Sequence, residues 1–317
     1  MKNIMNIGII GAGVVAERII NAAKEHPRAS IKSIYDTNKE RLKEVTQKYD
    51  IESIDSYKSL LEDKEIDIIY LAVPPKYHHP IALDIFNSGK HFICEKPLAN
   101  STEEAKSMYE LAEKKNMVCA MNFPTMYTKA YEKIEELLKE DFIGNLVRVE
   151  FQGYFTNWPR LWQQNNWIST REQGGFVREV ITHYIQITQR LFGDIENIVS
   201  FTEYPTDPAK SETSIIAKGE VNGKQILINA ITDIGMEEDL SFKIFGSKGT
   251  MYLNNWRELW VSGENGKMEK LEIEETSNLV GLLDNVFKAI DGKESNIVNF
   301  YEGYKTHKIV EKLLEGN

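Results

Sequence analysis

The sequence predicts an α/β protein: a doubly wound parallel sheet, followed by an α+β domain built on a large, mostly antiparallel open sheet. Up to residue 122, short apolar runs alternate with stretches of helical composition, the pattern of parallel strands joined by crossover helices. Beyond that point strand-like runs follow one another closely, and Asn222-Gly223 between two of them is a strong hairpin signal. A length of 317 residues suits two domains. We therefore expect domains over residues 1–122 and 123–317.

The start of the chain contains the first unit of the parallel sheet. Ile4–Ile10 is a short apolar run, typical of a strand buried on both faces. The small-residue turn Gly11-Ala12-Gly13-Val14-Val15-Ala16 follows, and apolar residues recur at helical spacing over Val14–Lys24. A second strand, Ile31–Tyr35, ends in Asp36. This order of strand, glycine turn, helix, strand and acidic residue indicates a dinucleotide-binding Rossmann fold.

Each residue of this motif has a physical task in binding a dinucleotide. Gly11 permits the tight turn, and Gly13 has no Cβ to keep the backbone away from a pyrophosphate. Val14 and Val15 begin the helix, whose free N–H groups and positive dipole end favour a phosphate. The Asp36 carboxylate accepts hydrogen bonds from both hydroxyls of the adenosine ribose and repels a 2′-phosphate. We therefore expect NAD as the cofactor and NADP to be disfavoured.

The rest of the first domain continues the alternation of strands and helices. The predicted strands are Ile66–Val73, His91–Cys94 and Met117–Met121, and the predicted helices are Lys39–Lys48, Tyr57–Leu61, Tyr77–Ser88 and Thr102–Lys115. Ligands of a doubly wound sheet bind where loops leave the carboxyl ends of the strands. Topology therefore places Pro74-Pro75 and Glu95-Lys96-Pro97 beside the cofactor.

The second half is predicted to form a sheet with helices on one face. Its predicted strands are Leu146–Tyr154, Ile198–Tyr204, Ser214–Val221, Gln225–Ile234, Leu240–Phe245, Met251–Leu253 and Glu258–Val261. Its predicted helices are Thr128–Glu140, Phe176–Phe192, Leu279–Ile290 and Tyr301–Leu314. The strands exceed what these helices can cover, and a large uncovered apolar face is a liability for a monomer. We therefore expect a homodimer or homotetramer.

Composition excludes several classes of partner. The chain has 38 basic and 48 acidic residues, a formal charge of -10, whereas nucleic-acid binders usually present a basic face. Cys94 and Cys119 lie in apolar strand-like runs, so we expect two reduced core thiols and neither a disulfide framework nor a metal site. No stretch approaches the length of a transmembrane helix, and no signal peptide is recognisable. We expect a cytoplasmic protein without nucleic-acid or membrane partners.

Two distant segments contain candidate catalytic residues. Lys96 follows a predicted strand of the nucleotide domain, where a small substrate can reach it. Glu179 and His183 lie one helical turn apart on an otherwise apolar helix. Ionisable side chains on a buried helix are costly unless they are paired or line a cleft. The residues alone allow both a structural pair and a catalytic site.

At these residues the chain resembles the Gfo/Idh/MocA oxidoreductases, a family named after glucose-fructose oxidoreductase and inositol dehydrogenase. The resemblance covers essentially the whole length and rests on Gly8–Gly13, Val73–His78, Gly89–Leu98 and Gly174-Gly175 with His183. It implies a Rossmann domain, then an α/β domain whose open sheet often forms the oligomer interface. It also implies reversible hydride transfer between a nicotinamide and a sugar, cyclitol or related hydroxyl-bearing substrate.

The resemblance also implies roles for individual residues. Lys96 matches the lysine that hydrogen-bonds the reacting oxygen and helps to move its proton. His183 matches the histidine that is general base in oxidation and general acid in reduction. Pro74 and His78 match the loop over the nicotinamide half of the cofactor, and Glu95 lies beside the lysine.

Two departures from the family pattern concern the substrate rather than the fold. Family members that act on sugars or cyclitols usually have aspartate four residues before the histidine, whereas this chain has Glu179. The stretch Asn122-Phe123-Pro124-Thr125 lacks the arginine that is common there. We therefore also consider a dehydrogenase or reductase of a non-sugar substrate, and a catalytically silent, NAD-binding regulator of the same fold.

The irregular, aromatic stretch Phe155–Gly174 leaves further alternatives open. Trp158, Trp162 and Trp167 are equally compatible with stacking on the apolar face of a sugar and with packing between domains. Arg160 and Arg171 are candidates for binding a carboxylate or phosphate of the substrate, and a surface role is at least as compatible with the sequence.

Overall fold

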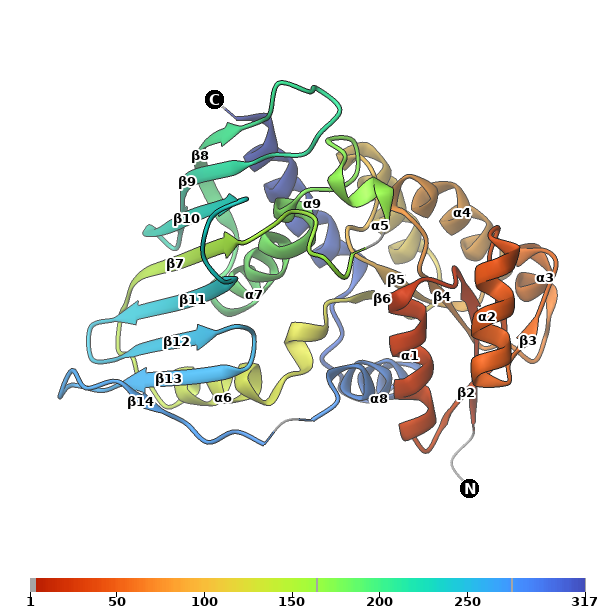
Figure 1. Ribbon diagram of the computed structural model, residues 1–317. Helices are drawn as coiled ribbons and strands as arrows, with labels where there is room; N and C mark the ends of the chain where they lie inside the picture. Colours follow the sequence, from red (N-terminus) through yellow and green to blue (C-terminus); the bar gives the residue numbers. More distant parts are fainter. Residues whose placement is uncertain (1–3, 164, 275, 317) are drawn as a thin grey trace. The chain divides into compact units, whose positions relative to one another are not determined.

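The computed structural model describes residues 4–163, 165–274 and 276–316, which form two compact units (Figure 1). The N-terminal unit contains the described residues up to Pro124 together with Ser277–Tyr304. The second unit contains the described residues of Thr125–Thr276 and those from Lys305 onward. The segment Ser277–Tyr304 thus differs from the predicted division, which placed everything after residue 122 in the second domain.

The N-terminal unit is built on a parallel sheet of six strands in the order β3-β2-β1-β4-β5-β6. This is the strand order of dinucleotide-binding sheets. The strands are β1 (Met5–Ile10), β2 (Ala29–Tyr35), β3 (Glu52–Ser53), β4 (Ile68–Leu71), β5 (His91–Glu95) and β6 (Cys119–Asn122). The helices of this part are α1 (Val14–Glu25), α2 (Lys39–Tyr49), α3 (Tyr57–Glu62), α4 (His78–Ser88) and α5 (Thr102–Lys114).

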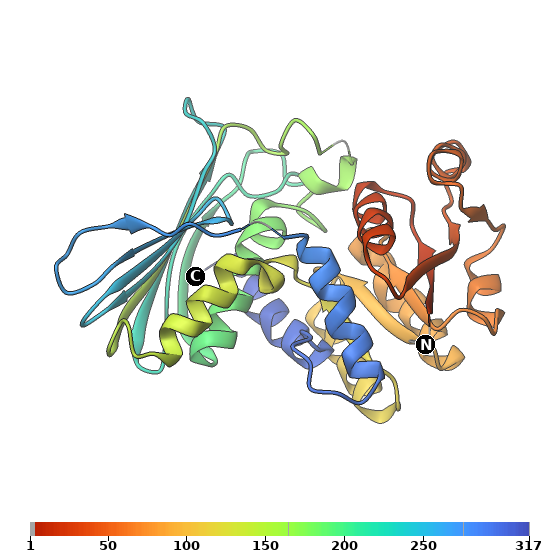
Figure 2. The same ribbon diagram turned by 90° about the horizontal axis from the view of Figure 1, so that it is seen from below.

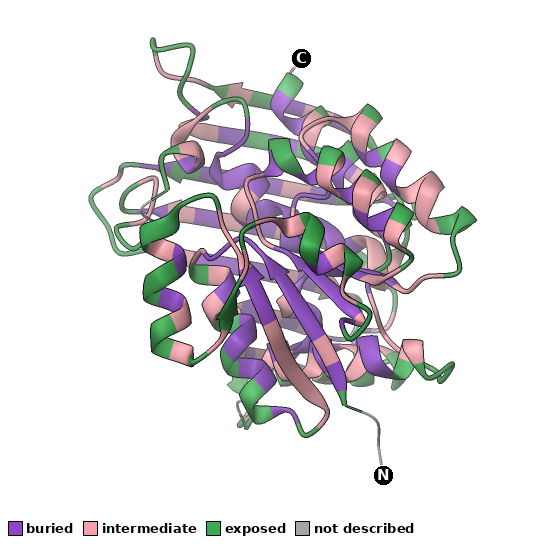
Figure 3. Ribbon diagram, turned by 90° about the vertical axis from the view of Figure 1, so that its right-hand side faces the viewer, coloured by how far each residue is buried: buried purple, intermediate pink, exposed green. Residues whose placement is uncertain are grey.

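The middle of this sheet forms the core of the N-terminal unit. All four residues of β4 are fully buried, because the dense apolar run is covered on both faces. Figure 3 shows the strands of this sheet as mainly buried and the outer faces of its helices as exposed. In register, Ile10 pairs with Leu71 and Leu71 with Cys94. The loops that follow β1, β4 and β5 therefore leave the sheet at the same edge.

The C-terminal return to this unit is held by specific contacts. It contains α8 (Asn278–Ile290) and the first residues of α9 (Phe300–Glu315). Arg28 forms a two-bonded ion pair with Asp291, at 2.8 and 3.0 Å. The backbone N–H of Met121, on edge strand β6, donates to the Val298 carbonyl at 2.7 Å. Composition alone does not predict this return, because the apolar face of α8 does not specify which unit it packs against.

The second unit contains an eight-stranded sheet in the order β14-β13-β12-β11-β7-β10-β9-β8. All neighbouring pairs are antiparallel except β7 and β10, which confirms the predicted mostly antiparallel sheet. The strands are β7 (Leu146–Phe155), β8 (Ile195–Glu203), β9 (Ser214–Val221), β10 (Lys224–Thr232), β11 (Asp239–Gly246), β12 (Thr250–Asn254), β13 (Glu258–Ser262) and β14 (Glu269–Lys270). Helices α6 (Lys129–Lys139), α7 (Thr182–Phe192) and the C-terminal part of α9 lie on one face of the sheet (Figure 2).

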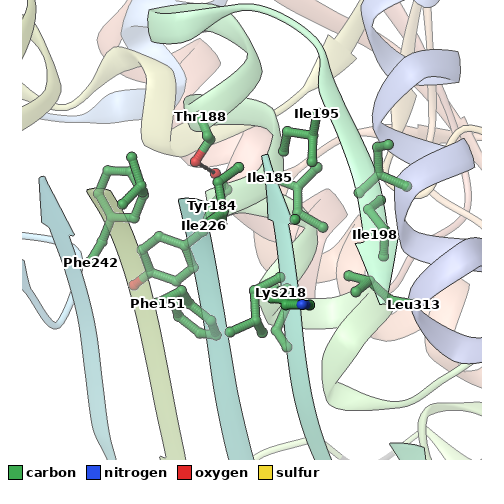
Figure 4. Close-up of a pocket in the computed structure, with 15 residues that line it drawn as sticks. Phe151, Tyr184, Ile185, Thr188, Ile195, Ile198, Lys218, Ile226, Phe242 and Leu313 are labelled. Carbon is green, nitrogen blue, oxygen red and sulfur yellow. Dashed lines mark hydrogen bonds between the residues drawn. The ribbon is translucent and has the colours of Figure 1, made fainter. Parts of the chain in front are cut away.

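The two faces of this sheet differ in burial. Alternate residues of β7, such as Val149 and Phe151, are buried toward the helices. A small apolar cavity of about 20 Å³ remains between α7 and the strands (Figure 4). On the other face, Phe201 and its cross-strand neighbour Ile216 are 65% and 62% exposed. This face has an apolar patch that no described helix covers.

The predicted helix Phe176–Phe192 was wrong in its first part. Val177–Ile181 is π-helical, and the α-helical hydrogen bonding of α7 begins only at Thr182. The apolar pattern could not show this, because a segment of five residues is too short to distinguish the two helical periods. Short π-helical insertions occur frequently at functional sites.

Candidate active site

The glycine turn after β1 is held between three strand ends of the N-terminal unit. Gly11 has φ +105°, and a Cβ on it would overlap the carbonyl of Ala72. Its N–H donates to the Tyr35 carbonyl at 2.8 Å, and the Ala72 N–H donates to the Ile10 carbonyl at 2.8 Å. Both the conformation and the close approach therefore require glycine.

The N-terminus of α1 is open to an anion. Gly13 is its N-cap and no side chain caps it, whereas Ser101 accepts a hydrogen bond from Glu104 N–H at the start of α5. A Cβ on Gly13 would meet nothing within 4 Å. Val14 is 44% exposed and Val15 is half-buried. The turn thus provides free N–H groups and open space, the requirements for a pyrophosphate.

Asp36 connects the end of β2 to this turn. Its Oδ2 accepts a hydrogen bond from the Ala12 N–H at 2.6 Å, and its Oδ1 accepts one from the Asn38 N–H at 2.7 Å. The carboxylate is half-buried, and each oxygen retains a lone pair for a further donor. The residues of the glycine turn and Asp36 therefore fit the phosphate and ribose groups of a dinucleotide.

His78 ties the loops after β4 and β5 together. Its ring is fully buried at the start of α4, with Nε2 2.8 Å from the Val73 carbonyl and Nδ1 2.9 Å from the Pro97 carbonyl. Burial lowers the pKa of this histidine. Pro74 precedes it as the N-cap of the 3₁₀ turn Pro75–Tyr77. The structure thus gives His78 a role in joining the loop after β4 to the backbone that directly follows Lys96.

Glu95 belongs to a buried polar network at the carboxyl ends of three neighbouring strands. Tyr70 Oη donates to its Oε1, and Asn122 Nδ2 donates to the same oxygen at 2.5 Å and to Tyr70 Oη at 3.0 Å. Burial and the Glu95 carboxylate raise the pKa of Tyr70 well above its usual range. Glu95 is thereby held in place, and Lys96, which follows it directly, is half-buried. Tyr70 was missed at the sequence level, because a tyrosine in a dense apolar run gives no signal of a polar partner.

In the second unit, Gly174-Gly175 positions the start of the π-helical segment. A Cβ on Gly174 would overlap the Ile168 carbonyl, and one on Gly175, which has φ +98°, would overlap the Glu212 carboxylate. Glu212 Oε1 accepts a hydrogen bond from the Val177 N–H at 2.8 Å. Burial raises the pKa of Glu212 to about 7. No local pattern of the sequence pointed to Glu212.

His183 and Glu179 lie on the helix that follows this turn. His183 is 8% exposed in the first turn of α7, and Glu179 is half-buried in the π-helical segment. The His183 ring is in edge contact with Trp256, with centroids 5.4 Å apart and an interplanar angle of 81°. Trp256 was also missed, because it lies in a hairpin turn 73 residues after His183 in the sequence.

Comparison with known proteins decides the family. Residues 5–123 match the model of the oxidoreductase family with the NAD-binding Rossmann fold, GFO_IDH_MocA. Residues 135–315 match the model of the C-terminal alpha/beta domain of the same family. The chain belongs to the Gfo/Idh/MocA oxidoreductases. The predicted family, fold class and NAD-binding domain are therefore confirmed.

Relatives of this Gfo/Idh/MocA oxidoreductase are similar over most of its length. It is 28% identical to levoglucosan dehydrogenase of Pseudarthrobacter phenanthrenivorans, over 95% of this chain and 75% of that protein. It is 24% identical to oxidoreductase P35 of Formosa agariphila, over 86% and 87% of the two chains.

Solved structures share its fold. A levoglucosan dehydrogenase in complex with NADH superposes with a TM-score of 0.89 at 21% identity, over 98% of this chain and 96% of the other. An oxidoreductase from Agrobacterium radiobacter in complex with NAD+, L-tartaric acid and magnesium gives a TM-score of 0.87 at 19% identity, over 98% and 95%.

The aromatic and basic side chains of Phe155–Gly174 have structural partners in this Gfo/Idh/MocA chain. Arg160 forms a two-bonded ion pair with Glu238, at 2.7 and 2.9 Å, and also lies over the ring of Trp158. Arg171 lies 3.7 Å from the ring centroid of Tyr204. The Trp158 ring packs edge-on against two phenylalanine rings, Trp162 is 51% exposed and Trp167 is half-buried.

The remaining expectations concern the cysteines, metal ligands and membrane-spanning helices. Cys94 and Cys119 are free and buried, in agreement with the prediction, and burial raises the pKa of the Cys119 thiol to about 12. No cluster of three or more potential metal-ligating side chains occurs among the described residues. None of the described helices combines the length and the apolar character that a membrane span requires.

Proposed function

We propose that this Gfo/Idh/MocA chain is an NAD-dependent dehydrogenase that oxidises a secondary hydroxyl of a sugar or cyclitol, or reduces the corresponding ketone. The main support is the Glu95-Lys96-Pro97 segment. A buried carboxylate with two hydrogen-bond donors, Tyr70 and Asn122, holds the backbone directly before a half-buried lysine. Ordering of this kind is expected for a lysine that must meet a substrate oxygen with a defined geometry.

Residues of the N-terminal unit would hold the cofactor. The glycine turn and the open N-terminus of α1 would bind the pyrophosphate, with Gly11, Gly13, Val14 and Val15 forming the cradle. Asp36 would accept hydrogen bonds from the adenosine ribose. Pro74, His78 and Glu95 would shape the loops near the nicotinamide half. When bound, NAD supplies the hydride acceptor for oxidation.

The chain's own residues would move the proton and stabilise charge. The Lys96 ammonium would donate a hydrogen bond to the reacting oxygen and stabilise the partial alkoxide that forms as hydride leaves the neighbouring carbon. His183 would take the hydroxyl proton in oxidation and return it in reduction. Glu179, one methylene longer than the usual aspartate, would position a substrate hydroxyl.

A sugar-like substrate is supported by the similarity of levoglucosan dehydrogenase to most of this chain. Glu179 and the absence of arginine at Asn122-Phe123-Pro124-Thr125 support the second candidate, a dehydrogenase of a non-sugar hydroxyl compound. The cofactor and the proton path would be the same in both cases.

A substrate screen tests the proposal. Formation of reduced nicotinamide is followed by absorbance over a panel of sugars, levoglucosan, cyclitols and simple hydroxy acids, each with NAD and with NADP. Turnover of a sugar or cyclitol with NAD is the expected result. If hydroxy acids are the only compounds turned over, the protein is the non-sugar enzyme. Normal NAD binding by calorimetry, with no turnover of any compound, selects the silent regulator and contradicts both enzyme proposals.

A further inference from the structure

Two hairpin turns of the second unit each place two successive residues in the left-handed conformation, although the β9–β10 loop has two residues and the β12–β13 loop has three. The β9–β10 turn contains Asn222 and Gly223, with φ 50° and 69°. The β12–β13 turn contains Asn255 and Trp256, with φ 44° and 70°. A pair of left-handed residues in a hairpin turn favours Asn-Gly, because glycine adopts this conformation at little cost. A tryptophan there is strained, and strain of this kind is frequent at functional sites.

The β12–β13 turn is anchored and defined in position. Arg257 N–H donates to the Asn254 carbonyl at 3.1 Å, which closes the turn. Asn255 joins it to β11, since its N–H donates to the Leu240 carbonyl at 2.9 Å and its Oδ1 accepts the Leu240 N–H at 3.0 Å. The indole of Trp256 therefore projects from a fixed backbone.

The indole is held between the core and His183. It stacks on the ring of Tyr184, with centroids 4.4 Å apart and planes 17° apart, and it is also in edge contact with the ring of His183. Tyr184 is 2% exposed and packs against Phe151 of β7 and Phe242 of β11, at 4.2 and 5.4 Å (Figure 4). A continuous stack of rings thus connects the sheet to the imidazole.

We propose that Trp256 is a positioning residue that fixes the orientation of the His183 imidazole, and that the strained turn is kept for this contact. The inference rests on the proposed function of His183. Rotation of a histidine ring about χ2 has broad minima, so helix geometry alone does not fix it. A general base must meet its proton at hydrogen-bond distance, and a displacement of about 1 Å costs on the order of 10²-fold in rate.

Three variants separate positioning from simple packing. Trp256→Gly removes the ring and gives this turn the Asn-Gly sequence that the β9–β10 turn already has, so the chain still folds. We expect kcat to fall by about 10- to 100-fold, with the KM of the hydroxyl substrate and the Kd of NAD within about threefold of wild type. Trp256→Phe keeps an aromatic ring and should retain kcat within about threefold.

Gly223→Ala is the matched control. It adds backbone strain at the equivalent position of the other hairpin, where a Cβ meets nothing within 4 Å. It should lower the melting temperature and leave kcat unchanged.

A readout independent of turnover distinguishes failure of the positioning role of Trp256 from failure of the proposed enzymatic function. Hydrogen–deuterium exchange at Cε1 of the six histidines, followed by mass spectrometry, reports the exposure of each ring. Trp256→Gly should speed exchange at His183 several-fold and leave the exchange of His78 unchanged. Wild-type kcat together with unchanged exchange in Trp256→Gly overturns the inference. If wild type has no activity on any compound and Trp256→Gly still speeds exchange at His183, only the proposed function fails.

Discussion

Asp36 and Ala12 are joined by a 2.6 Å hydrogen bond, from the Ala12 N–H to Asp36 Oδ2. The residue that is expected to bind the ribose therefore also fixes the glycine turn that is expected to bind the pyrophosphate. Nearby, Arg41 donates from Nε to the Ala12 carbonyl at 2.9 Å and pairs with Glu17. Although burial opposes it, hydrogen bonds from Lys48, Arg41 and Tyr49 lower the pKa of Glu17 to about 2, so Arg41 is engaged at neutral pH.

These contacts predict a preference for NAD over NADP. The Asp36 carboxylate repels a 2′-phosphate, and Arg41 is already paired. Asp36→Ser should narrow the ratio of kcat/KM between the two cofactors and lower kcat/KM with NAD, because the turn also loses its hydrogen bond. Asp36→Asn keeps an acceptor for the Ala12 N–H, so its kcat/KM with NAD should fall less than that of Asp36→Ser. A wild-type advantage for NADP, measured with any active substrate, contradicts the assignment of Asp36.

Lys96→Met should nearly abolish turnover and leave NAD affinity roughly intact. The proposed role of the amine is to serve the reacting oxygen, and the pyrophosphate is assigned to the glycine turn. Steady-state kinetics and calorimetric titration with NAD measure the two effects separately. Lys106→Met, at an exposed lysine of α5, is the matched control and should keep wild-type kcat. Full activity of Lys96→Met is incompatible with the proposed proton path.

The parts of the fold that depend on local pattern could be predicted from the sequence. The β1–α1–β2 unit is an example, because the glycines, the apolar strands and Asp36 lie within 36 residues. The Asn222-Gly223 hairpin is another, since that dipeptide matches the left-handed turn found there. Contacts between distant residues could not be predicted.

Glu212 and Trp256 illustrate the limit. Glu212 contacts the segment Val177–Phe192 from the loop before β9, and Trp256 contacts it from a hairpin turn; neither residue stands in a recognisable motif. The return of Ser277–Tyr304 to the N-terminal unit was missed for the same reason. An amphipathic helix shows that one face will be buried, but its sequence does not name the partner.

The pair Glu179 and His183 gives a prediction that separates two roles. His183→Ala should lower kcat by on the order of 10²–10⁴ and remove an ionisation from the pH profile of kcat/KM. If Glu179 positions substrate, Glu179→Gln should mainly lower kcat/KM. If it only pairs with His183, the same change should lower the apparent pKa of the histidine and the stability, with modest loss of activity at high pH. Wild-type kcat in His183→Ala would contradict a general base at this position.

The uncovered face of the second sheet predicts self-association. Phe201 and Ile216 are exposed cross-strand neighbours on it, and patches of this kind are usually buried in an interface. Light scattering should give at least about twice the chain mass of 36.4 kDa at micromolar concentration. Phe201→Asp should shift the population toward monomer, whereas Leu161→Asp, at an exposed residue outside the sheet, should not. A wild-type protein that is monomeric under these conditions refutes this prediction.

The buried carboxyl group of Glu212 should make the free energy of unfolding decrease as pH rises toward neutrality. Glu212 is 1% exposed, its carboxylate lies against Gly175, and burial raises its pKa from 4.5 to about 7. Between these two values the folded chain binds more protons than the unfolded chain, so the free energy of unfolding falls as pH rises. The difference between these two pKa values corresponds to at most about 3 kcal/mol of unfolding free energy over this window.

Denaturant unfolding of wild type and Glu212→Gln between pH 4.5 and 8 measures the effect. The variant cannot titrate at this position, and it retains an acceptor for the Val177 N–H. Its free energy of unfolding should therefore rise relative to that of wild type by up to about 3 kcal/mol as pH rises. Arg178 and Glu311 remain as the neighbouring ion pair in both proteins. Glu203→Gln, at an exposed carboxyl group of β8, is the control and should leave the pH dependence as in wild type. Equal slopes for wild type and Glu212→Gln would show that Glu212 is ionised in the folded protein throughout this range, stabilised by the Val177 N–H and the Arg178 charge.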